Sequence, residues 1–210
     1  MKNQPITVYP LFSSPLCETY IDKVSDSEEQ FLLNSEFERM FSGNGYISVN
    51  KYILNTFEMA NLKKEIMKRF EFYVRDFLKI SDEIGFRLTT SWVVKHSPGD
   101  FADIHTHLNS VFSGVVYLKV MENSGDIIFH RNNSNSTILP KFFSSKHTEW
   151  NIYNCERYRI TPENRKILFF SSLSTHSIDK NSSNEDRYSL AFNFFPTGKF
   201  GFRVNELYLN

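Results

Sequence analysis

The amino-acid sequence predicts a mainly β protein with helices in its N-terminal part and a jelly-roll core. Three observations lead to this class. Short runs rich in Val, Ile, Thr and aromatic residues follow one another between residues 87 and 197. Clusters of turn-forming residues separate these runs. A long segment with helical periodicity precedes them.

The chain before residue 87 is expected to supply one strand and supporting helices. Residues 6–12 (ITVYPLF) have the composition of a strand, and Pro10 predicts an edge strand because proline cannot donate a ladder hydrogen bond. Ser25 and Glu28 form a capping-box pattern, which predicts a helix that continues to Phe37.

A longer helix is predicted from Thr56 to about Ile80. Apolar residues recur there at spacings of three and four, so they share one face, while basic residues mostly take the other. The apolar positions are Leu62, Ile66, Phe70, Tyr73 and Phe77. We expect this helix to pack on the sheet and assign it no chemistry.

No linker separates the helices from the β region, so we expect a single domain over residues 1–210. Residues 1–86 would support the jelly-roll core at residues 87–197. Within the core, residues 131–157 form a long polar run with embedded aromatic residues, which is typical of a lid insertion. Trp150 is the candidate substrate contact there; the alternative is an ordinary surface insertion.

Composition excludes some partners. The chain has 24 basic and 24 acidic residues, so its net charge gives no reason to expect nucleic acid or an anionic membrane. Cys17 and Cys155 match no metal or redox spacing, and we expect free thiols in a reducing compartment, with one long-range disulfide as the alternative. We expect neither a signal peptide nor a membrane span, hence a cytoplasmic protein. The sequence indicates no particular oligomeric state.

The placement of histidines suggests a metal centre. His105 and His107 lie two apart in IHTHL, and on a strand this spacing points both imidazoles to one face. Two neutral imidazoles side by side suit a divalent transition metal. The pair alone is equally compatible with two histidines on a solvated or packed strand face. His176 follows the apolar run KILFF and is the third candidate ligand.

Arg187 and Ser189 come next, in a strand rich in Phe. A buried guanidinium is costly unless it meets an anion, and its planar fork matches a carboxylate best. Ser189 shares the face of Arg187 and could add a hydroxyl to the same carboxylate. This order of residues makes sense for a metal with a carboxylate co-substrate anchored on a neighbouring strand.

Two stretches carry a family resemblance. SWVVKHSPGDFADIHTHLNSVFSGVVYLKVMENSGDIIFH and KILFFSSLSTHSIDKNSSNEDRYSLAFNFF together resemble the 2-oxoglutarate/Fe(II) oxygenase family of bacteria and phages, a relative of the prolyl 4-hydroxylase group. The resemblance implies a double-stranded β-helix that binds Fe(II) and 2-oxoglutarate. It also implies that dioxygen is used to couple decarboxylation of 2-oxoglutarate to oxidation of a substrate, with hydroxylation as the expected outcome.

The resemblance assigns roles residue by residue. His105 and His176 match the two metal histidines, and His107 stands where most relatives have Asp or Glu. Asp103 lies on the same predicted strand face and is the alternative third ligand. Arg187 matches the basic residue that grips the far carboxylate of 2-oxoglutarate.

Three further residues are candidates. Tyr117 falls on a strand that, by the resemblance, often gives a hydrogen bond to the co-substrate. Asn109 follows the histidine pair and is a candidate contact to water or substrate. His96 either lines the co-substrate pocket or has a structural role.

Two other functions stay open. A cupin-type metalloprotein with three histidine ligands would need no 2-oxo acid, but it leaves Arg187 unexplained, and no acid follows the His pair closely. A non-enzymatic binding module would leave the metal site empty even when iron is supplied. The expected substrate is a small molecule or a peptide, with no nucleic-acid or membrane partner.

Overall fold

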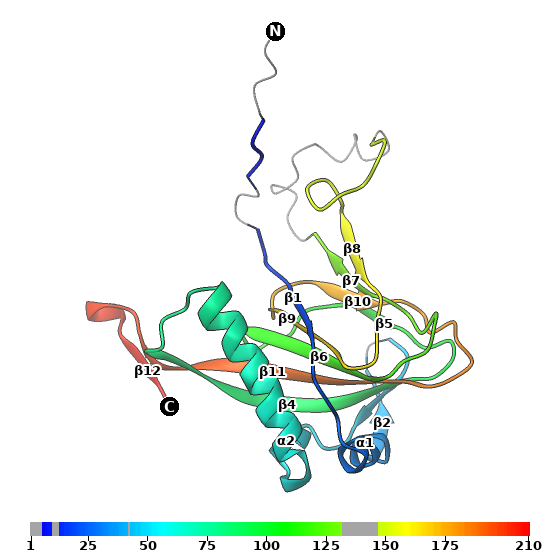
Figure 1. Ribbon diagram of the computed structural model, residues 1–210. Helices are drawn as coiled ribbons and strands as arrows, with labels where there is room; N and C mark the ends of the chain where they lie inside the picture. Colours follow the sequence, from blue (N-terminus) through cyan, green and yellow to red (C-terminus); the bar gives the residue numbers. More distant parts are fainter. Residues whose placement is uncertain (1–5, 10–12, 42, 132–146) are drawn as a thin grey trace.

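The structure is a computed structural model, and it describes residues 6–9, 13–41, 43–131 and 147–210. Two antiparallel sheets pack together, and the helices lie on the outer side of the larger sheet (Figure 1). The elements in chain order are β1 (Cys17–Tyr20), α1 (Asp26–Leu33), β2 (Phe37–Arg39), β3 (Tyr46–Ser48), η1 (Ile53–Asn55), η2 (Phe57–Met59), α2 (Ala60–Glu71), η3 (Phe72–Phe77), β4 (Ile84–His96), β5 (Ala102–His105), β6 (Phe112–Lys119), β7 (Ile127–His130), β8 (Arg157–Ile160), β9 (Lys166–Ser171), β10 (His176–Ile178), β11 (Arg187–Phe200), η6 (Arg203–Asn205) and β12 (Leu207–Leu209).

The strand order gives the two layers of a jelly roll. The larger sheet runs β1-β9-β6-β11-β4-β3-β2, with β12 paired to the end of β11, and the smaller sheet runs β5-β10-β7-β8. The predicted class, mainly β with N-terminal helices and a double-stranded β-helix core, is confirmed. The long strands β4 and β11 pair along most of their length and form the centre of the larger sheet.

A helix-on-sheet core fills the outer side of the larger sheet. Its residues from α2 are Leu62, Ile66 and Phe70, all buried. The Phe70 ring stacks on that of Phe194 with centroids 3.8 Å apart. The helical segment predicted from residue 56 is present, but it consists of the short turn η2, then α2, then the π-helical turn η3.

The predicted capping box is confirmed, and its acid caps two helices. Glu28 Oε2 accepts a hydrogen bond from the backbone N–H of Ser25 at 2.9 Å, at the start of α1. Its Oε1 accepts from the backbone N–H of Leu62 at 2.8 Å, in the first turn of α2. One buried carboxylate therefore satisfies donors at both N-termini. The prediction that α1 continues to Phe37 is wrong, because the helix ends at Leu33 and Phe37 pairs with β3.

The predicted edge strand at residues 6–12 is not found where the chain is described. Residues 6–9 form no strand, and residues 10–12 lie outside the described residues. Ile6 is 91% exposed, so an apolar run without a sheet partner does not become a strand. The edge strand of the larger sheet is instead β1, which pairs with β9.

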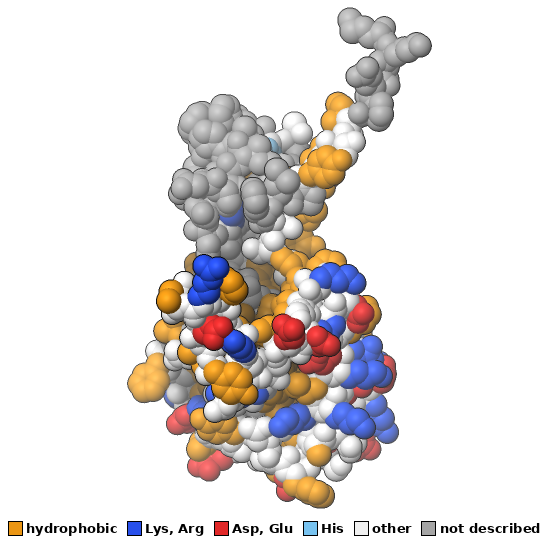
Figure 2. Space-filling view, turned by 90° about the vertical axis from the view of Figure 1, so that its left-hand side faces the viewer, with side chains coloured by type: hydrophobic (Ala, Val, Ile, Leu, Met, Phe, Trp, Pro, Cys, Tyr) orange, Lys and Arg blue, Asp and Glu red, His pale blue; other side chains and the backbone are white. Residues whose placement is uncertain are grey.

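Two features bear on the environment of the protein. Cys17 and Cys155 are free thiols, as predicted. Within the described part of the chain, no helix has the length and apolarity needed to cross a membrane. Acidic, basic and hydrophobic side chains are interspersed on the face seen in Figure 2.

Candidate metal and co-substrate site

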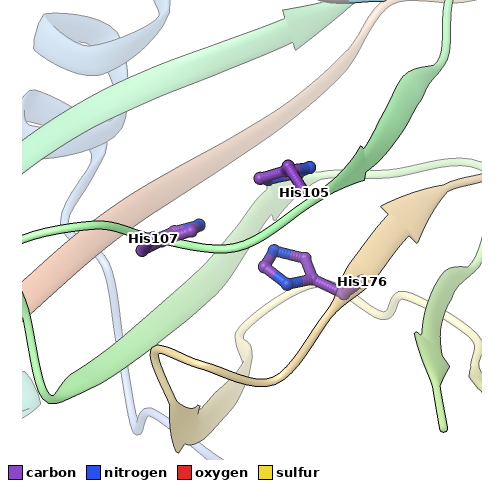
Figure 3. Close-up of side chains that lie close together, drawn as sticks. All are labelled: His105, His107 and His176. Atoms are coloured by element: carbon purple, nitrogen blue, oxygen red, sulfur yellow. The ribbon is translucent and has the colours of Figure 1, made fainter. Parts of the chain in front are cut away.

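Three histidines converge between the two sheets. His105, His107 and His176 point their rings toward one another (Figure 3), and one ligand atom from each lies within 4.8 Å of the others. The ring centroid of His176 is 4.3 Å from that of His105 and 5.1 Å from that of His107. Among the described residues, this is the group of histidines, cysteines and acids that could hold a metal ion.

The three rings come from different local structures. His105 ends β5 and His176 begins β10, and the two residues stand opposite each other in the antiparallel pair. His107 lies beyond the end of β5, so the prediction that one strand carries both members of the His-x-His pair is wrong. The loop is fixed instead by a 3.0 Å hydrogen bond from the backbone N–H of His107 to the carbonyl of Ser172.

Backbone carbonyls in β5 and just before β10 orient two of the rings. His105 Nδ1 lies 2.8 Å from the carbonyl oxygen of Asp103, and His176 Nδ1 lies 2.9 Å from that of Ser174. A carbonyl can only accept a hydrogen bond, so each Nδ1 carries the proton. Each Nε2 is then left with its lone pair available for a metal.

Burial keeps His107 and His176 neutral. Burial, followed by the proximity of His105, lowers the pKa of His176 to about 3. Burial also lowers the pKa of His107. Metal ligation needs the neutral imidazole, so both rings are in the binding form at neutral pH.

The alternative ligand Asp103 stands apart from this cluster. Its side chain is exposed and does not belong to the converging group. Its contact with the site is through its backbone carbonyl, which accepts from His105. The converging group therefore contains three neutral ligands and no carboxylate.

A second polar cluster surrounds Arg187 at the start of β11. Arg187 is 1% exposed, and no acidic side chain among the described residues forms an ion pair with it. Its Nη1 lies 3.4 Å from Nδ1 of His96, the residue opposite it on β4. Its guanidinium carbon lies 5.2 Å from the ring centroid of Tyr117.

Three buried polar atoms in this cluster lack a hydrogen-bond partner in the described structure. They are Nε of Arg187, the hydroxyl of Tyr117 and Nε2 of His96. Burial raises the pKa of Tyr117 to about 12, so its hydroxyl keeps a proton to donate. Nδ1 of His96 is placed to accept from Arg187, which leaves the proton on Nε2. The unpaired groups are thus all donors, which is the arrangement that an anion would satisfy.

The inner face of the larger sheet connects the two clusters. Alternate residues of β11 face inward, and they run from Arg187 through the buried Ser189 to Asn193, which contacts His107. Ser189 is paired across the sheet with Tyr117. The apolar cluster that includes Tyr117 also includes Phe170, whose ring centroid is 5.1 Å from that of His176.

Some site residues escaped the sequence reasoning. Asn193 and Ser113 contact Nδ1 of His107 at 2.7 and 3.0 Å, and the Trp92 ring lies 5.7 Å from that of His107. The alternation of side chains along a strand could have identified Asn193, because it lies an even number of residues after Arg187 and therefore on the same inward face of β11.

The two substrate candidates are less closely tied to the site. Asn109 is exposed, has a positive φ of 57°, and lies in the loop that carries His107. Trp150 is 52% exposed and its ring lies 4.8 Å from that of His147. Of the predicted lid at residues 131–157, residues 132–146 lie outside the described residues.

Comparison with known protein families gives a match over the region that carries the site. Residues 90–193 match the family model described as "Putative 2OG-Fe(II) oxygenase". The matched range contains the three histidines and Arg187. No curated protein matches the chain.

Several solved structures have a similar fold. HygX from Streptomyces hygroscopicus, with nickel, 2-oxoglutarate and hygromycin B bound, has a TM-score of 0.61 at 11% identity and covers 90% of this chain and 86% of its own. A Pseudomonas putida prolyl-4-hydroxylase has a TM-score of 0.55 at 12% identity, covering 87% and 93%. A prolyl hydroxylase from Trichoplax adhaerens, in complex with a hypoxia inducible factor peptide, has a TM-score of 0.58 at 15% identity, covering 86% and 83%.

Proposed function

Since the chain belongs, through residues 90–193, to the 2OG-Fe(II) oxygenase family, we propose that it is a non-haem Fe(II) dioxygenase. It couples oxidative decarboxylation of 2-oxoglutarate to the oxidation of a second substrate. The proposed metal ligands are His105, His107 and His176, and the proposed co-substrate residues are Arg187, Ser189 and Tyr117.

The observation that carries this proposal is the buried, unpaired guanidinium of Arg187. An isolated buried cation costs several kcal/mol in desolvation. The neighbouring Tyr117 and His96 bring further buried donors that lack acceptors. A carboxylate placed among these three groups would satisfy all of them. A dicarboxylate with a 2-oxo group can accept hydrogen bonds from these groups at one end and present its other end to a metal.

The residues of the chain have separable roles in this reaction. Fe(II), when bound with 2-oxoglutarate and dioxygen, supplies an oxidation in which the 2-oxo acid loses carbon dioxide to give succinate and the substrate gains one oxygen atom. The histidines hold the ion through Nε2 atoms that are already free. Arg187 binds and orients the far carboxylate. The apolar residues Leu168 and Phe170 keep water from the space between the two clusters.

The charge of the ligand set suits this co-substrate. Three neutral imidazoles do not offset the two positive charges of a divalent ion. The near carboxylate of a 2-oxo acid would offset one of these two charges, while its far carboxylate offsets the charge of Arg187. The replacement of the usual carboxylate by His107 therefore strengthens the attraction of the site for the co-substrate.

Finer features of the function are part of the same proposal. The reaction is hydroxylation, and the substrate is a small molecule or a peptide, the two classes bound by HygX and by the Trichoplax enzyme. Equal numbers of acidic and basic residues favour neither nucleic acid nor membrane as partner. The free thiols of Cys17 and Cys155 fit a reducing cytoplasm.

Two segments complete the proposal. The chain forms one domain, in which the region before residue 87 supports the core. Residues 131–157 would form a lid, with Trp150 and Asn109 as substrate contacts. Both side chains are exposed and lie on loops, and this supports a role in contacting substrate.

The test is a visible spectrum recorded without oxygen. Adding Fe(II) and then 2-oxoglutarate to the metal-free protein should produce a weak metal-to-ligand charge-transfer band only when both are present. Iron binding without such a band would favour the cupin-type metalloprotein. Failure to bind iron would favour the binding module. Arg187→Met, which should keep iron and lose the band, separates chelation of the 2-oxo acid from metal binding alone.

A further inference from the structure

The structure contains a hydrogen-bonded chain of side chains that begins at the partly exposed Ser110, continues through buried residues and ends at His107. Ser110 Oγ donates to Ser172 Oγ at 2.8 Å, and Ser172 Oγ lies 2.8 Å from Ser113 Oγ. Ser113 Oγ donates to Oδ1 of Asn193 at 2.7 Å. Nδ1 of His107 lies 2.7 Å from the same Oδ1. Three serine hydroxyls thus lead to one acceptor, the amide oxygen of Asn193, which also contacts the candidate ligand.

The amide of Asn193 is held in one orientation from its other end. Its Nδ2 donates to Oγ1 of Thr90 at 3.0 Å, on the neighbouring strand β4. Asn193 is 7% exposed and Ser113 is fully buried, so water competes little for these bonds. With Nδ2 committed to Thr90, Oδ1 must face His107 and Ser113.

The directions of the bonds fix the proton on His107. If Ser110, Ser172 and Ser113 each donate to the next group, the chain ends on one lone pair of Oδ1. The second lone pair accepts from Nδ1 of His107. Nδ1 also lies 3.0 Å from Ser113 Oγ, but that hydroxyl has given its proton to Oδ1 and can only accept from the ring. A reversed amide would donate to Nδ1 instead, and the proton would move to Nε2, where it would block a metal.

We propose that Asn193 is the positioning residue that makes His107 a metal ligand, by holding its ring in the Nδ1–H tautomer with Nε2 free. This inference rests on the proposed function for the identity of the site. It assigns to β11 a part in both halves of that site, because Arg187 and Asn193 lie on the same face of the same strand. It also explains how a histidine works where related enzymes carry an acid: the larger sheet supplies an acceptor for it.

The experiment compares Asn193→Leu with Asn193→Asp, each measured in two ways. Two-bond ¹H–¹⁵N spectra of the metal-free protein report the tautomer of His107. Titration with Co(II), followed by its visible absorption, reports metal affinity. In the unsubstituted protein we expect the Nδ1–H tautomer. Asn193→Leu should give mixed tautomers and a roughly 10–100-fold loss of Co(II) affinity, and Asn193→Asp, which keeps the acceptor, should restore both.

Two matched variants distinguish an effect on the tautomer from a loss of folding. Thr90→Val leaves Asn193 in place but frees its amide, and it should shift the tautomer in the same direction as Asn193→Leu. Ser91→Ala, the next residue on β4, alters a buried hydroxyl on the opposite side of the sheet, where it accepts from the backbone of Leu54. It should lower stability without changing the tautomer.

Several results would overturn the inference. One is an Nε2–H tautomer in the unsubstituted protein; another is an unchanged tautomer and Co(II) affinity in Asn193→Leu. Equal losses in Asn193→Leu and Asn193→Asp would mean that side-chain packing, not the acceptor, matters. If the unsubstituted protein bound no Co(II), the proposed function would fail, whereas the tautomer measurement on the metal-free protein would still decide the role of Asn193.

Discussion

Nη1 of Arg187 lies 3.4 Å from Nδ1 of His96, so a buried cation rests against an imidazole and not against an acid. Burial, followed by the charge of Arg187, lowers the pKa of His96 to about 3. The ring is therefore neutral and can accept from the guanidinium. The positive charge stays on Arg187, where it is available to an anionic ligand.

The first prediction concerns Arg187→Met. The affinity for 2-oxoglutarate should fall by more than about 30-fold, since loss of one partner of a buried charged pair costs at least about 2 kcal/mol. Fe(II) affinity should stay unchanged, because Arg187 does not belong to the histidine cluster. Both are measurable by anaerobic calorimetry. As a control, Arg159→Met removes an exposed arginine of β8 and should leave both affinities unaltered.

The same substitution should raise the free energy of unfolding of the metal-free protein. Removal of a buried charge that has no ion-pair partner relieves its desolvation penalty, which is on the order of several kcal/mol per ion. Urea unfolding of the two metal-free proteins checks this. A destabilised Arg187→Met protein would show that the guanidinium contributes to the fold and does not await a ligand.

The second prediction is a pH dependence that originates at His96. Its folded pKa of about 3 lies below the ordinary value of 6.5, so above pH 6.5 the ring is neutral in both folded and unfolded chains. As pH falls from 6.5 toward 3, only the unfolded chain takes up the proton, and stability is lost by up to about 1.4 kcal/mol per pH unit. His96→Gln should show a shallower loss in urea unfolding between pH 7.5 and 5. Parallel curves for the two proteins would contradict this origin.

The third prediction separates the candidate third ligands. Asp103→Asn should bind Co(II) as the unsubstituted protein does, because the Asp103 carboxylate is exposed and outside the cluster. His107→Ala should lose at least about tenfold in affinity, and His107→Asp should retain a site because a carboxylate is an accepted ligand there. The measurement is metal titration of the three variants side by side. Loss of binding in Asp103→Asn alone would move the third ligand to that residue.

The fourth prediction tests the core on the other side of the larger sheet. Phe70→Ala should destabilise the protein by about 3–5 kcal/mol, because the buried ring contacts Phe194, Phe86, Phe112 and Phe169. Phe72→Ala, two residues along the same helical segment, removes a ring that is 64% exposed and should cost less than about 1 kcal/mol. Denaturant unfolding measures both, and equal costs would contradict the helix-on-sheet core.

The sequence predicted those features that depend on local patterns. The spacing of Glu28 from Ser25 predicted the capping box. The composition of the core strands and the turn residues between them predicted the strands. The end of β5 at His105 could not be predicted, because nothing in IHTHL distinguishes a strand residue from a loop residue once the ladder stops. The bonds that place His107 come from Ser172 and Asn193, which are distant in the chain and become neighbours only through the pairing of β9, β6 and β11.

The facing positions of His105 and His176 have a mechanical consequence. An ion bound by both would act as a cross-link between points far apart in the chain, and such a link lowers the entropy of the unfolded state. The strands that it joins, β5 and β10, are only four and three residues long. A tie at their ends would thus reinforce the smaller sheet, so that removal of iron should loosen it while the larger sheet, backed by α2, stays closed to hydrogen exchange.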